Sequence, residues 1–190
     1  MARACGVDLR KQGSGNIGAT NAMRVLGKPA GFSVLFLDAF KGYAAVHWLP
    51  GLNQALEPGH GAVPEWVPLV TGIAAVLGHN YTIWLRFHGG KGIATTAGVY
   101  AALAPWPLLL AVGVFVVMVA LTRYVSLGSI AAAVALPLAV CLMCPGNPSL
   151  KWVTIALGVM AVVKHRSNLG RLLAGTENRL GQKKRETHNS

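Results

Sequence analysis

The sequence is poor in acidic residues: six Asp and Glu stand against 17 Lys and Arg among 190 residues, which gives a net charge of +11. Charged residues make up only 12% of the chain, whereas 53% of it is hydrophobic. A soluble nucleic-acid-binding protein has the opposite mixture, many charges with modest hydrophobicity, so we expect no nucleic-acid partner. Few charges with a basic excess are instead typical of a membrane protein whose cations gather on one side.

Cysteine is also scarce, since Cys5, Cys141 and Cys144 are the three present and give no disulfide framework. Cys141 and Cys144 have the C-x-x-C spacing of a redox or metal motif. They lie in an apolar run, however, with no second pair or nearby histidine to complete a ligand set. We therefore interpret them as packing residues and expect no metal. The first 16 residues lack the apolar stretch of a secretory signal.

Long apolar runs separated by short polar segments occupy most of the chain. The run over residues 66–85 has the ~20 residues that a helix needs to cross ~30 Å of hydrocarbon. Residues 93–122 carry no charge, and Pro105-Trp106-Pro107 divides them into two short spans. The runs also lack the alternation of a β-barrel strand. We predict an all-α fold, a polytopic membrane helical bundle of about six spans, formed by residues 30–49, 66–85, the two parts of 93–122, 127–144 and 152–163.

The positions of the basic residues test this division of the chain into six spans. If successive loops face opposite sides of a membrane, 15 of the 17 Lys and Arg residues share one side, while the other side holds Lys151 with Glu57 and Glu65. The side rich in cations is the cytoplasmic one. We therefore expect a multi-pass protein of the cell inner membrane with both termini cytoplasmic. One integral membrane domain would cover 1–190, including a cytoplasmic glycine-rich loop over 1–29 and a basic cytoplasmic tail over 164–190.

The first polar loop, residues 13–24, reads GSGNIGATNAMR. It matches G-x-G-x-x-G in form, but a dinucleotide-binding loop follows a strand in a βαβ unit, whereas this loop precedes a membrane span. Glycines let backbone N–H groups turn inward, and a helix start adds its dipole, so the loop suits an oxyanion. A flexible Gly/Ser linker is the alternative. Linkers seldom contain so dense a set of polar side chains, which here are Ser14, Asn16, Thr20, Asn21 and Arg24.

The second polar loop, residues 78–95, contains Gly89-Gly90-Lys91-Gly92 directly before an apolar run. It is not a Walker A loop, which would need glycine at position 85 and Ser or Thr at position 92. Lys91 nevertheless offers a point charge beside exposed amides, and a basic membrane anchor in a tight turn is the alternative. Farther along, Ser126 and Ser129 open the fifth run, where at least one of them is expected to cap a helix.

Charged and polar residues near the ends of the spans complete the pattern. His165 and Asn168 share one helical face by their i, i+3 spacing, and a histidine that reaches an alcohol could orient it or take its proton. The segment RLLAGTENR, residues 171–179, indicates an amphipathic interfacial helix. Asp38 and Lys41 lie within the first span at i, i+3 spacing, where pairing lowers the cost of burying them. A structural pair or a strut to the loops is the favoured interpretation, and a proton relay is the alternative.

The chain closely resembles the acyl-phosphate:glycerol-3-phosphate acyltransferases of bacterial inner membranes. The resemblance runs in order between residues 7 and 179 through GSGNIGATNAMR, LDAFKG, GHNYTIWLRFHGGKGIAT, VSLGSI and HRSNLGRLLAGTENR. It implies transfer of an acyl group from acyl phosphate to the 1-hydroxyl of sn-glycerol 3-phosphate, the first acylation of phospholipid synthesis. The products would be lysophosphatidic acid and inorganic phosphate. No cofactor, metal, coenzyme A or acyl carrier protein is implied.

The resemblance also implies a site. Catalytic roles fall to Ser14, Arg24, Lys91, His165 and Asn168: the two cations would neutralise phosphate charge, and His165 and Asn168 would hold glycerol 3-phosphate. The loop amides would hold the donor phosphate, which makes the substrate-binding candidates Gly15, Asn16, Ile17, Gly18, Ala19, Thr20, Asn21, Ser126 and Ser129. Because acyl phosphate is already activated, such a site needs mainly to bring two anions together and stabilise an oxyanion. We slightly favour the departing phosphate over His165 as the proton acceptor.

One departure and two alternatives accompany this resemblance. Chains of the family ordinarily begin with an apolar span ahead of GVDLRKQGSGN, so the resemblance implies seven spans where this sequence shows six. A different acyltransferase class uses H-x-x-x-x-D, and no histidine here has Asp five positions later. The alternative function is a membrane transporter or channel for a phosphorylated metabolite. That class should show internal repeats or further polar residues through the spans, and the sequence shows neither beyond Asp38 and Lys41.

Overall fold

The computed structural model describes residues 6–56 and 62–181, and every regular element within these ranges is helical. Two short 3₁₀ helices, η2 (Leu9–Lys11) and η3 (Ile83–Leu85), accompany the α-helices. The α-helices are α1 (Ala19–Leu26), α2 (Lys28–His47), α3 (Leu49–Leu56), α4 (Val67–Asn80), α5 (Ile93–Leu103), α6 (Pro105–Thr122), α7 (Val125–Met143), α8 (Pro148–Lys164) and α9 (Arg166–Leu173). The predicted all-α class is confirmed.

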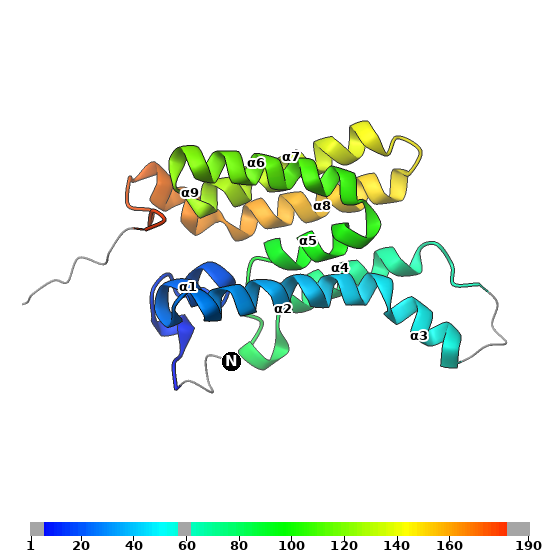
Figure 1. Cartoon of the computed structure of the whole chain (residues 1–190), viewed down its shortest axis with the longest axis horizontal. Helices are drawn as coiled ribbons and strands as arrows, with labels where there is room; N and C mark the ends of the chain where they lie inside the picture. The colour runs from blue at the N-terminus through cyan, green and yellow to red at the C-terminus, as the bar shows by residue number, and fades with distance from the viewer. Residues whose placement is uncertain (1–5, 57–61, 182–190) are drawn as a thin grey trace, which may run out of the picture.

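The long helices lie roughly along one direction, in two groups. Figure 1 shows α6, α7 and α8 together on one side of the bundle, with α2, α4 and α5 on the other. Buried apolar side chains from both groups form one core, among them Val76, Val99, Tyr100, Val140 and Leu157. The short helices α1 and α9 lie at the same end of the bundle, where the polar loops gather (Figure 1).

Each predicted apolar run becomes a helix, although the ends differ. The second run was predicted to continue to residue 85, but α4 ends at Asn80 and the chain turns through η3. Pro105-Trp106-Pro107 was predicted to separate two spans, but only Ala104 lies between α5 and α6. The prolines belong to the first turn of α6, where the N–H that proline lacks is not needed. The sixth run starts earlier than predicted, since Asn147 caps α8 by accepting the N–H of Leu150 at 2.9 Å.

The outer surface of the bundle is apolar, as lipid contact requires. Among the described residues α6 and α7 have both the length and the composition of membrane spans, with 18 and 19 residues and a mean hydropathy of 2.2 each. The remaining helices are shorter or more polar. Large apolar side chains that face outward include Trp106, Leu121 and Leu142, which are 70%, 77% and 80% exposed.

Glycine brings α2 and α5 into close contact. A Cβ at Gly98 would clash with the carbonyl oxygen of Ala39, and one at Gly42 would clash with that of Thr95. Without side chains at these two points the helix backbones can approach each other, which is how small residues hold membrane helices together. This contact matters for function because α2 carries α1 and the first polar loop, while α5 begins directly after Lys91.

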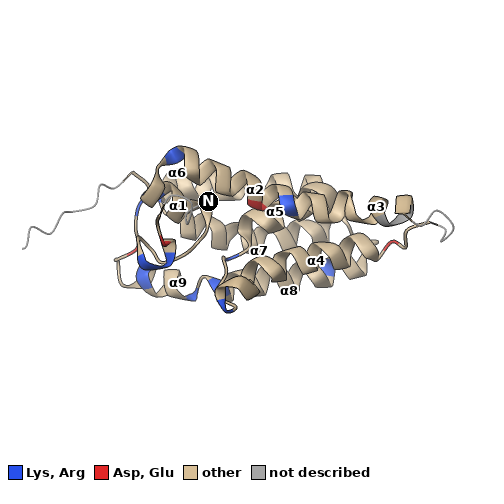
Figure 2. Ribbon diagram, turned by 90° about the horizontal axis from the view of Figure 1, so that it is seen from below, with Lys and Arg blue, Asp and Glu red and all other residues tan. Residues whose placement is uncertain are grey.

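The charges gather at one end of the bundle. Figure 2 shows most of the Lys and Arg residues at the end that carries α1 and α9. Lys41 lies within α2 and pairs with Asp38, and Lys151 lies in the first turn of α8. The tail residues Lys183, Lys184 and Arg185, which the sequence assigned to the same side, lie outside the described residues.

Candidate functional site

The first polar loop is shaped by the side chain of Asn21, which is 2% exposed. Its Nδ2 lies within hydrogen-bonding distance of the carbonyl oxygens of Leu9, Gln12 and Asn16, at 3.1, 3.0 and 2.7 Å, and its Oδ1 accepts the N–H of Ser14 at 2.8 Å. The turns around it need left-handed backbone at Gly13 and Gly15, with φ of 61° and 72°. Asn21 is therefore committed to holding the loop in shape, and Ser14 is fixed at its centre.

This loop delivers the N-terminus of α1 to the site. Gly18 precedes the helix with extended backbone, and its N–H is bound by the Asn16 side chain at 2.8 Å. The N–H groups of Asn21 and Ala22 donate to the carbonyl oxygen of Gly18 at 3.1 and 3.0 Å. Those of Ala19 and Thr20, one turn earlier, have no partner within the helix and lie at its positive end. Arg24 follows on the same helix. No strand precedes the loop within the described residues, so the rejection of a dinucleotide-binding unit is confirmed.

The second polar loop is seated on the end of α4. Gly90 donates its N–H to the carbonyl oxygen of His79 at 3.1 Å, and Gly89 donates to that of Asn80 at 3.3 Å. A Cβ on Gly90 would clash with the imidazole of His79, and one on Gly89 with the carbonyl oxygen of the same residue. These two glycines therefore let the chain pass directly over the helix end. Lys91 follows at once, so its position is set by this close contact.

His79 is itself held from α2. Lys41 Nζ lies 2.5 Å from Asp38 Oδ1 and 2.6 Å from His79 Nδ1, and the same carboxylate oxygen lies 3.3 Å from His79 Nδ1. The Asp38–Lys41 pair expected from the sequence is present. It also extends to His79, and so links α2 to the helix end under the glycine–lysine loop, as the strut interpretation anticipates.

Lys91 and Asn168 meet across the site, where Lys91 Nζ donates to Asn168 Oδ1. Burial lowers the pKa of Lys91 to about 8; the charge of Glu177 opposes this shift, and those of Arg171 and Arg24 add to it. The ammonium is thus held largely out of water by neighbours that include no directly bonded carboxylate among the described residues. Such a cation is well suited to an incoming anion.

His165 is 3% exposed at the junction of α8 and α9. Its Nδ1 lies 2.8 Å from the carbonyl oxygen of Ala161. A carbonyl oxygen can only accept, so Nδ1 carries the hydrogen and Nε2 keeps a lone pair. Burial and then the charge of Lys91 lower the pKa of His165 to about 4. The imidazole is therefore a neutral hydrogen-bond acceptor at physiological pH, and a weak base.

Glu177 is the residue that sequence reasoning missed. Its side chain is 7% exposed and accepts hydrogen bonds from Ser126 Oγ at 3.0 Å, Asn168 Nδ2 at 2.8 Å and Arg171 Nε at 2.7 Å. Burial acts to raise the pKa of Glu177, but these hydrogen bonds outweigh it and lower the pKa. The sequence signal that could have identified Glu177 was a single carboxylate in a basic segment. Residues 171–179 were predicted to form a helix, and this was wrong after Leu173. The chain turns at Gly175, with φ of 69°, and brings Glu177 back to the site.

The serines of α7 also differ from expectation. Tyr124 occupies the N-cap position, so neither serine caps the helix. Ser126 donates to Glu177, and Ser129 donates to the carbonyl oxygen of Val125 at 2.9 Å. Both serines are buried and face the site from the helix wall.

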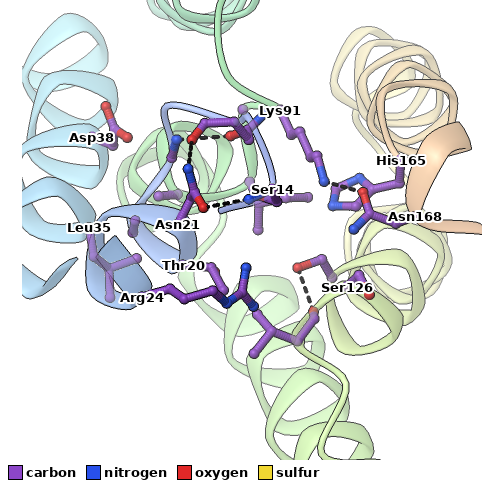
Figure 3. Close-up of a pocket in the computed structure, with 18 of the residues that line it drawn as sticks. Ser14, Thr20, Asn21, Arg24, Leu35, Asp38, Lys91, Ser126, His165 and Asn168 are labelled. Atoms are coloured by element: carbon purple, nitrogen blue, oxygen red, sulfur yellow. Dashed lines mark hydrogen bonds between the residues drawn. The ribbon is translucent and has the colours of Figure 1, made fainter. Parts of the chain in front are cut away.

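A cavity of about 160 Å³, here called the inner cavity, joins these groups. Figure 3 shows Lys91, His165 and Asn168 directed toward one another, with Arg24 and Ser126 across the space. The structure thus brings together on this cavity Ser14, Asn16, Gly18, Ala19, Thr20, Asn21, Arg24, Lys91, Ser126, Ser129, His165 and Asn168. Gly15 and Ile17 do not line it and face a neighbouring cavity instead. Residues that line it without having been predicted include Leu35, Asp38, His79, Phe115, Val125 and Glu177.

The lining of the inner cavity is of two chemical kinds. Arg24, Lys91 and the α1 N-terminus supply positive charge, and Leu35, Ile93, Phe115 and Val125 supply apolar surface. Leu35 is 43% exposed, so the apolar part of the lining reaches the outer surface of the bundle. The arrangement can hold an amphiphile with a phosphate head and an apolar tail.

Comparison with known sequences gives a consistent result. A family model described as glycerol-3-phosphate acyltransferase matches residues 1–175. The glycerol-3-phosphate acyltransferase of Geobacter sulfurreducens is 48% identical over 179 residues, which cover 94% of this chain and 87% of that protein. The enzyme of the same name from Desulforamulus reducens is 49% identical over 179 residues, covering 94% of this chain and 84% of that protein.

Solved structures agree with this comparison. The crystal structure of PlsY (YgiH), described as an integral membrane glycerol 3-phosphate acyltransferase in its glycerol 3-phosphate form, matches with a TM-score of 0.81 and 41% identity. The match covers 95% of this chain and 86% of that one. The lysophosphatidic acid form of PlsY matches with a TM-score of 0.78 and 39% identity, covering 95% and 85%.

Proposed function

This chain belongs to the glycerol-3-phosphate acyltransferase family of integral membrane proteins, and from that premise we propose that it transfers an acyl group from acyl phosphate to the 1-hydroxyl of sn-glycerol 3-phosphate. The products are lysophosphatidic acid and inorganic phosphate. The observation that carries the proposal is the lining of the inner cavity. It combines two cations and a helix N-terminus with apolar side chains, of which Leu35 reaches the outer surface of the bundle.

The polar part of the lining accommodates phosphate through fixed positive charge. Arg24 offers a planar guanidinium, Lys91 a partly buried ammonium, and the start of α1 its free N–H groups. Two phosphate-bearing substrates repel each other, and these groups offset that repulsion. We assign the donor phosphate to the loop around Ser14 and the α1 N-terminus. Glycerol 3-phosphate lies on the opposite side, near Lys91, His165 and Asn168.

Bond changes in the transfer are simple. The 1-hydroxyl oxygen of glycerol 3-phosphate attacks the acyl carbonyl carbon, and the bond from that carbon to the phosphate oxygen breaks. The charge that develops on the carbonyl oxygen is stabilised by the preorganised donors of the loop. One of them is the hydroxyl of Ser14, a residue whose backbone N–H is fixed to Asn21. The phosphate leaves with the electron pair of the broken bond.

The proton of the hydroxyl goes to the departing phosphate. His165, with a pKa of about 4, is too weak a base to remove it efficiently near neutral pH. The phosphate oxygen that keeps the electron pair of the broken bond is the stronger base and takes the proton. His165 Nε2 instead accepts a hydrogen bond from the hydroxyl and orients it. Asn168, held by Lys91 and Glu177, is the neighbouring orienting group.

The membrane supplies the acyl chain. The apolar part of the inner cavity's lining, with Leu35 and Phe115, holds the part of the tail nearest the reacting carbon while the rest lies among lipids. By the positive-inside rule the end with α1 and α9 faces the cytoplasm, so the protein resides in the cell inner membrane with this face inward. No cofactor or metal takes part in the proposed reaction.

Purified protein in detergent tests the proposal directly. Acyl phosphate and glycerol 3-phosphate together are expected to release inorganic phosphate and form lysophosphatidic acid in equal amounts, as measured by phosphate assay and mass spectrometry. Each substrate alone is the control, and acyl-coenzyme A is the competing donor. Equal turnover with acyl-coenzyme A would refute the donor assignment. No acyl transfer from any donor, together with uptake of a phosphorylated metabolite into vesicles, would instead favour the transporter.

A further inference from the structure

A second cavity adjoins the inner one on the polar face of the bundle. This outer cavity measures about 590 Å³ and lies between the loop over residues 85–91, the turn over residues 14–17 and the start of α9. It shares Ser14, Asn16 and Lys91 with the inner cavity. The two spaces are therefore neighbours separated by a wall of polar side chains. The function proposed above uses only the inner one.

The outer cavity is strongly basic. Within the part of the chain that the structure describes, no acidic residue lines it. Its basic residues are Arg10, Arg86, Lys91, Lys164, Arg166 and Arg171. A concave surface lined by one sign of charge, with low-dielectric walls, concentrates ions of opposite charge from solution.

Several of these cations are already engaged. Arg10 pairs with Asp8 at 2.7 Å and Arg171 with Glu177 at 2.7 Å. Lys164 donates to the carbonyl oxygen of Asn80 at 2.9 Å and lies 3.9 Å from the centre of the Tyr81 ring. Arg86 and Arg166 have no acidic partner among residues 6–56 and 62–181. These two guanidinium groups are therefore available to bind an anionic ligand.

The backbone places Arg86 at the cavity by an unusual turn. Arg86 and Phe87 both adopt left-handed conformations, with φ of 52° and 63°, which residues with side chains rarely do. The turn is held by hydrogen bonds from the N–H of Phe87 to the Thr82 carbonyl oxygen at 3.0 Å and between His88 Nδ1 and the Arg86 carbonyl oxygen at 2.7 Å. A costly conformation kept by its surroundings is typical of a functional position.

We infer that the outer cavity is a capture site for a phosphate-bearing dianion. Arg86 and Arg166 hold the ligand there before it passes Lys91 into the inner cavity. The inference rests on the proposed function for the identity of the ligand, which is glycerol 3-phosphate on its way in. Inorganic phosphate on its way out shares the same chemistry and would use the same cations.

Arg86→Gln and Arg166→Gln remove the two unpaired charges while keeping side-chain length and polarity close to the original. Lys151→Gln is the matched control, because it removes one positive charge at the far end of α8 from Lys164. Arg86→Lys restores the charge without the guanidinium. The measured quantity is kcat/KM for glycerol 3-phosphate at low and high ionic strength, where the screening length is about 30 Å at 0.01 M and about 3 Å at 1 M.

At low ionic strength each single variant is expected to lose roughly threefold in kcat/KM and the double variant roughly tenfold, because each charge acts on the dianion across several ångströms of water. At high ionic strength the variants converge on the unmodified protein. The kcat at saturating glycerol 3-phosphate and the KM for acyl phosphate stay within about twofold, since neither reports capture of the dianion. Arg86→Lys retains most of the rate, and Lys151→Gln matches the unmodified protein.

Three results would overturn the inference. The first is an unchanged kcat/KM in the double variant at low salt, and the second is a loss equal at both salt concentrations. The third is a loss carried by kcat. Titration calorimetry with inorganic phosphate supplies a readout independent of turnover, and weaker binding by the double variant is expected. If the chain transfers no acyl group but this binding difference is present, the proposed function fails and the capture site stands. Equal phosphate binding removes the site even if the enzyme is active.

Discussion

Lys91 is a cation whose charge depends on its surroundings. It is partly buried where Gly89 and Gly90 bring the chain against α4, and it donates a hydrogen bond to Asn168. This burial lowers the pKa of Lys91 to about 8. Arg24, the other cation of the inner cavity, lies on α1 and offers a planar guanidinium that can bind two oxygens of one phosphate. The two cations therefore differ in geometry: one is a planar fork, and the other is a point charge.

Replacing either cation is expected to cost activity through the transition state. Arg24→Ala and Lys91→Ala should each lower kcat at least ~100-fold, the effect of losing one preorganised donor to developing charge. Lys28→Ala, which removes an exposed cation at the start of α2, is the control and should keep the original rate. Rates near that of the unmodified protein for the Lys91 or Arg24 variant would remove that residue from the site.

The pH profile should show the lowered pKa of Lys91. A pKa lowered to about 8 means that the ammonium is complete below that pH and is lost as pH rises through it. We expect kcat/KM for glycerol 3-phosphate to fall above about pH 8, since this quantity reports groups of the free enzyme. Lys91→Arg should move the fall to higher pH. His165, with a pKa of about 4, should contribute no change between pH 6 and 8. A flat profile to pH 10 would contradict the assignment.

Residue types and spacing were enough to predict which polar side chains lie together at the site, but not the role of each of them. The glycine loops, the two cations and the His165–Asn168 pair could be selected because oxyanion binding needs those groups. Glu177 could not, because its place depends on a chain reversal at Gly175 rather than on periodicity. Asn21 was expected to face a ligand, yet its amide is committed to the carbonyl oxygens of its own loop.

At the scale of the helix, hydropathy predicted that the membrane helices exist more reliably than it predicted where each helix ends. Residues 81–85 are as apolar as a span, but there the backbone leaves α4, and Trp84 is 89% exposed. Apolar composition measures transfer to lipid and does not say where the backbone turns. The α1 helix was expected only as a helix start in a loop, because a segment of eight residues with low average hydrophobicity does not stand out as an apolar run.

The α2–α5 contact predicts a sharp difference between two glycines. Gly98→Leu places a side chain against the carbonyl oxygen of Ala39 and should force the helices apart, lowering stability by about 3 kcal/mol or more. Gly113→Leu on α6 meets open space and is the matched control. The measurement is the midpoint of thermal unfolding in detergent. A Gly98→Leu variant as stable as Gly113→Leu would show that the two helices do not need this close approach.

At the scale of the molecule, the end that carries charge and the end that carries little are separated by the length of the bundle (Figure 2). The sequence predicted this separation because loop charge follows membrane orientation. The family resemblance also implied that loops from distant parts of the chain share one site, but it did not give the two cavities that they enclose. The shape of those cavities depends on packing between α2 and α5 and between α7 and α8, which periodicity does not specify.

Orientation in the membrane can be measured with single cysteines. After removal of the three native cysteines, Lys28→Cys and Gly146→Cys introduce exposed thiols beside α1 and between α7 and α8. A membrane-impermeant maleimide added to spheroplasts is expected to label the Gly146→Cys variant and spare the other, and inverted vesicles should give the reverse. Labelling of both variants from one side would refute the multi-pass arrangement proposed here.

The wall shared by the two cavities, at Ser14, Asn16 and Lys91, has a consequence for the sequence of events in turnover. A lipid-soluble donor can enter laterally from the hydrocarbon, while a water-soluble acceptor enters from the aqueous side. Neither substrate then blocks the entry of the other. Both partners can then be present at once and in either order. The reciprocal of the steady-state rate can be plotted against the reciprocal concentration of one substrate, at several fixed concentrations of the other. Such plots would accordingly give intersecting lines, the pattern of a ternary complex, rather than the parallel lines of an enzyme that stores the acyl group on itself.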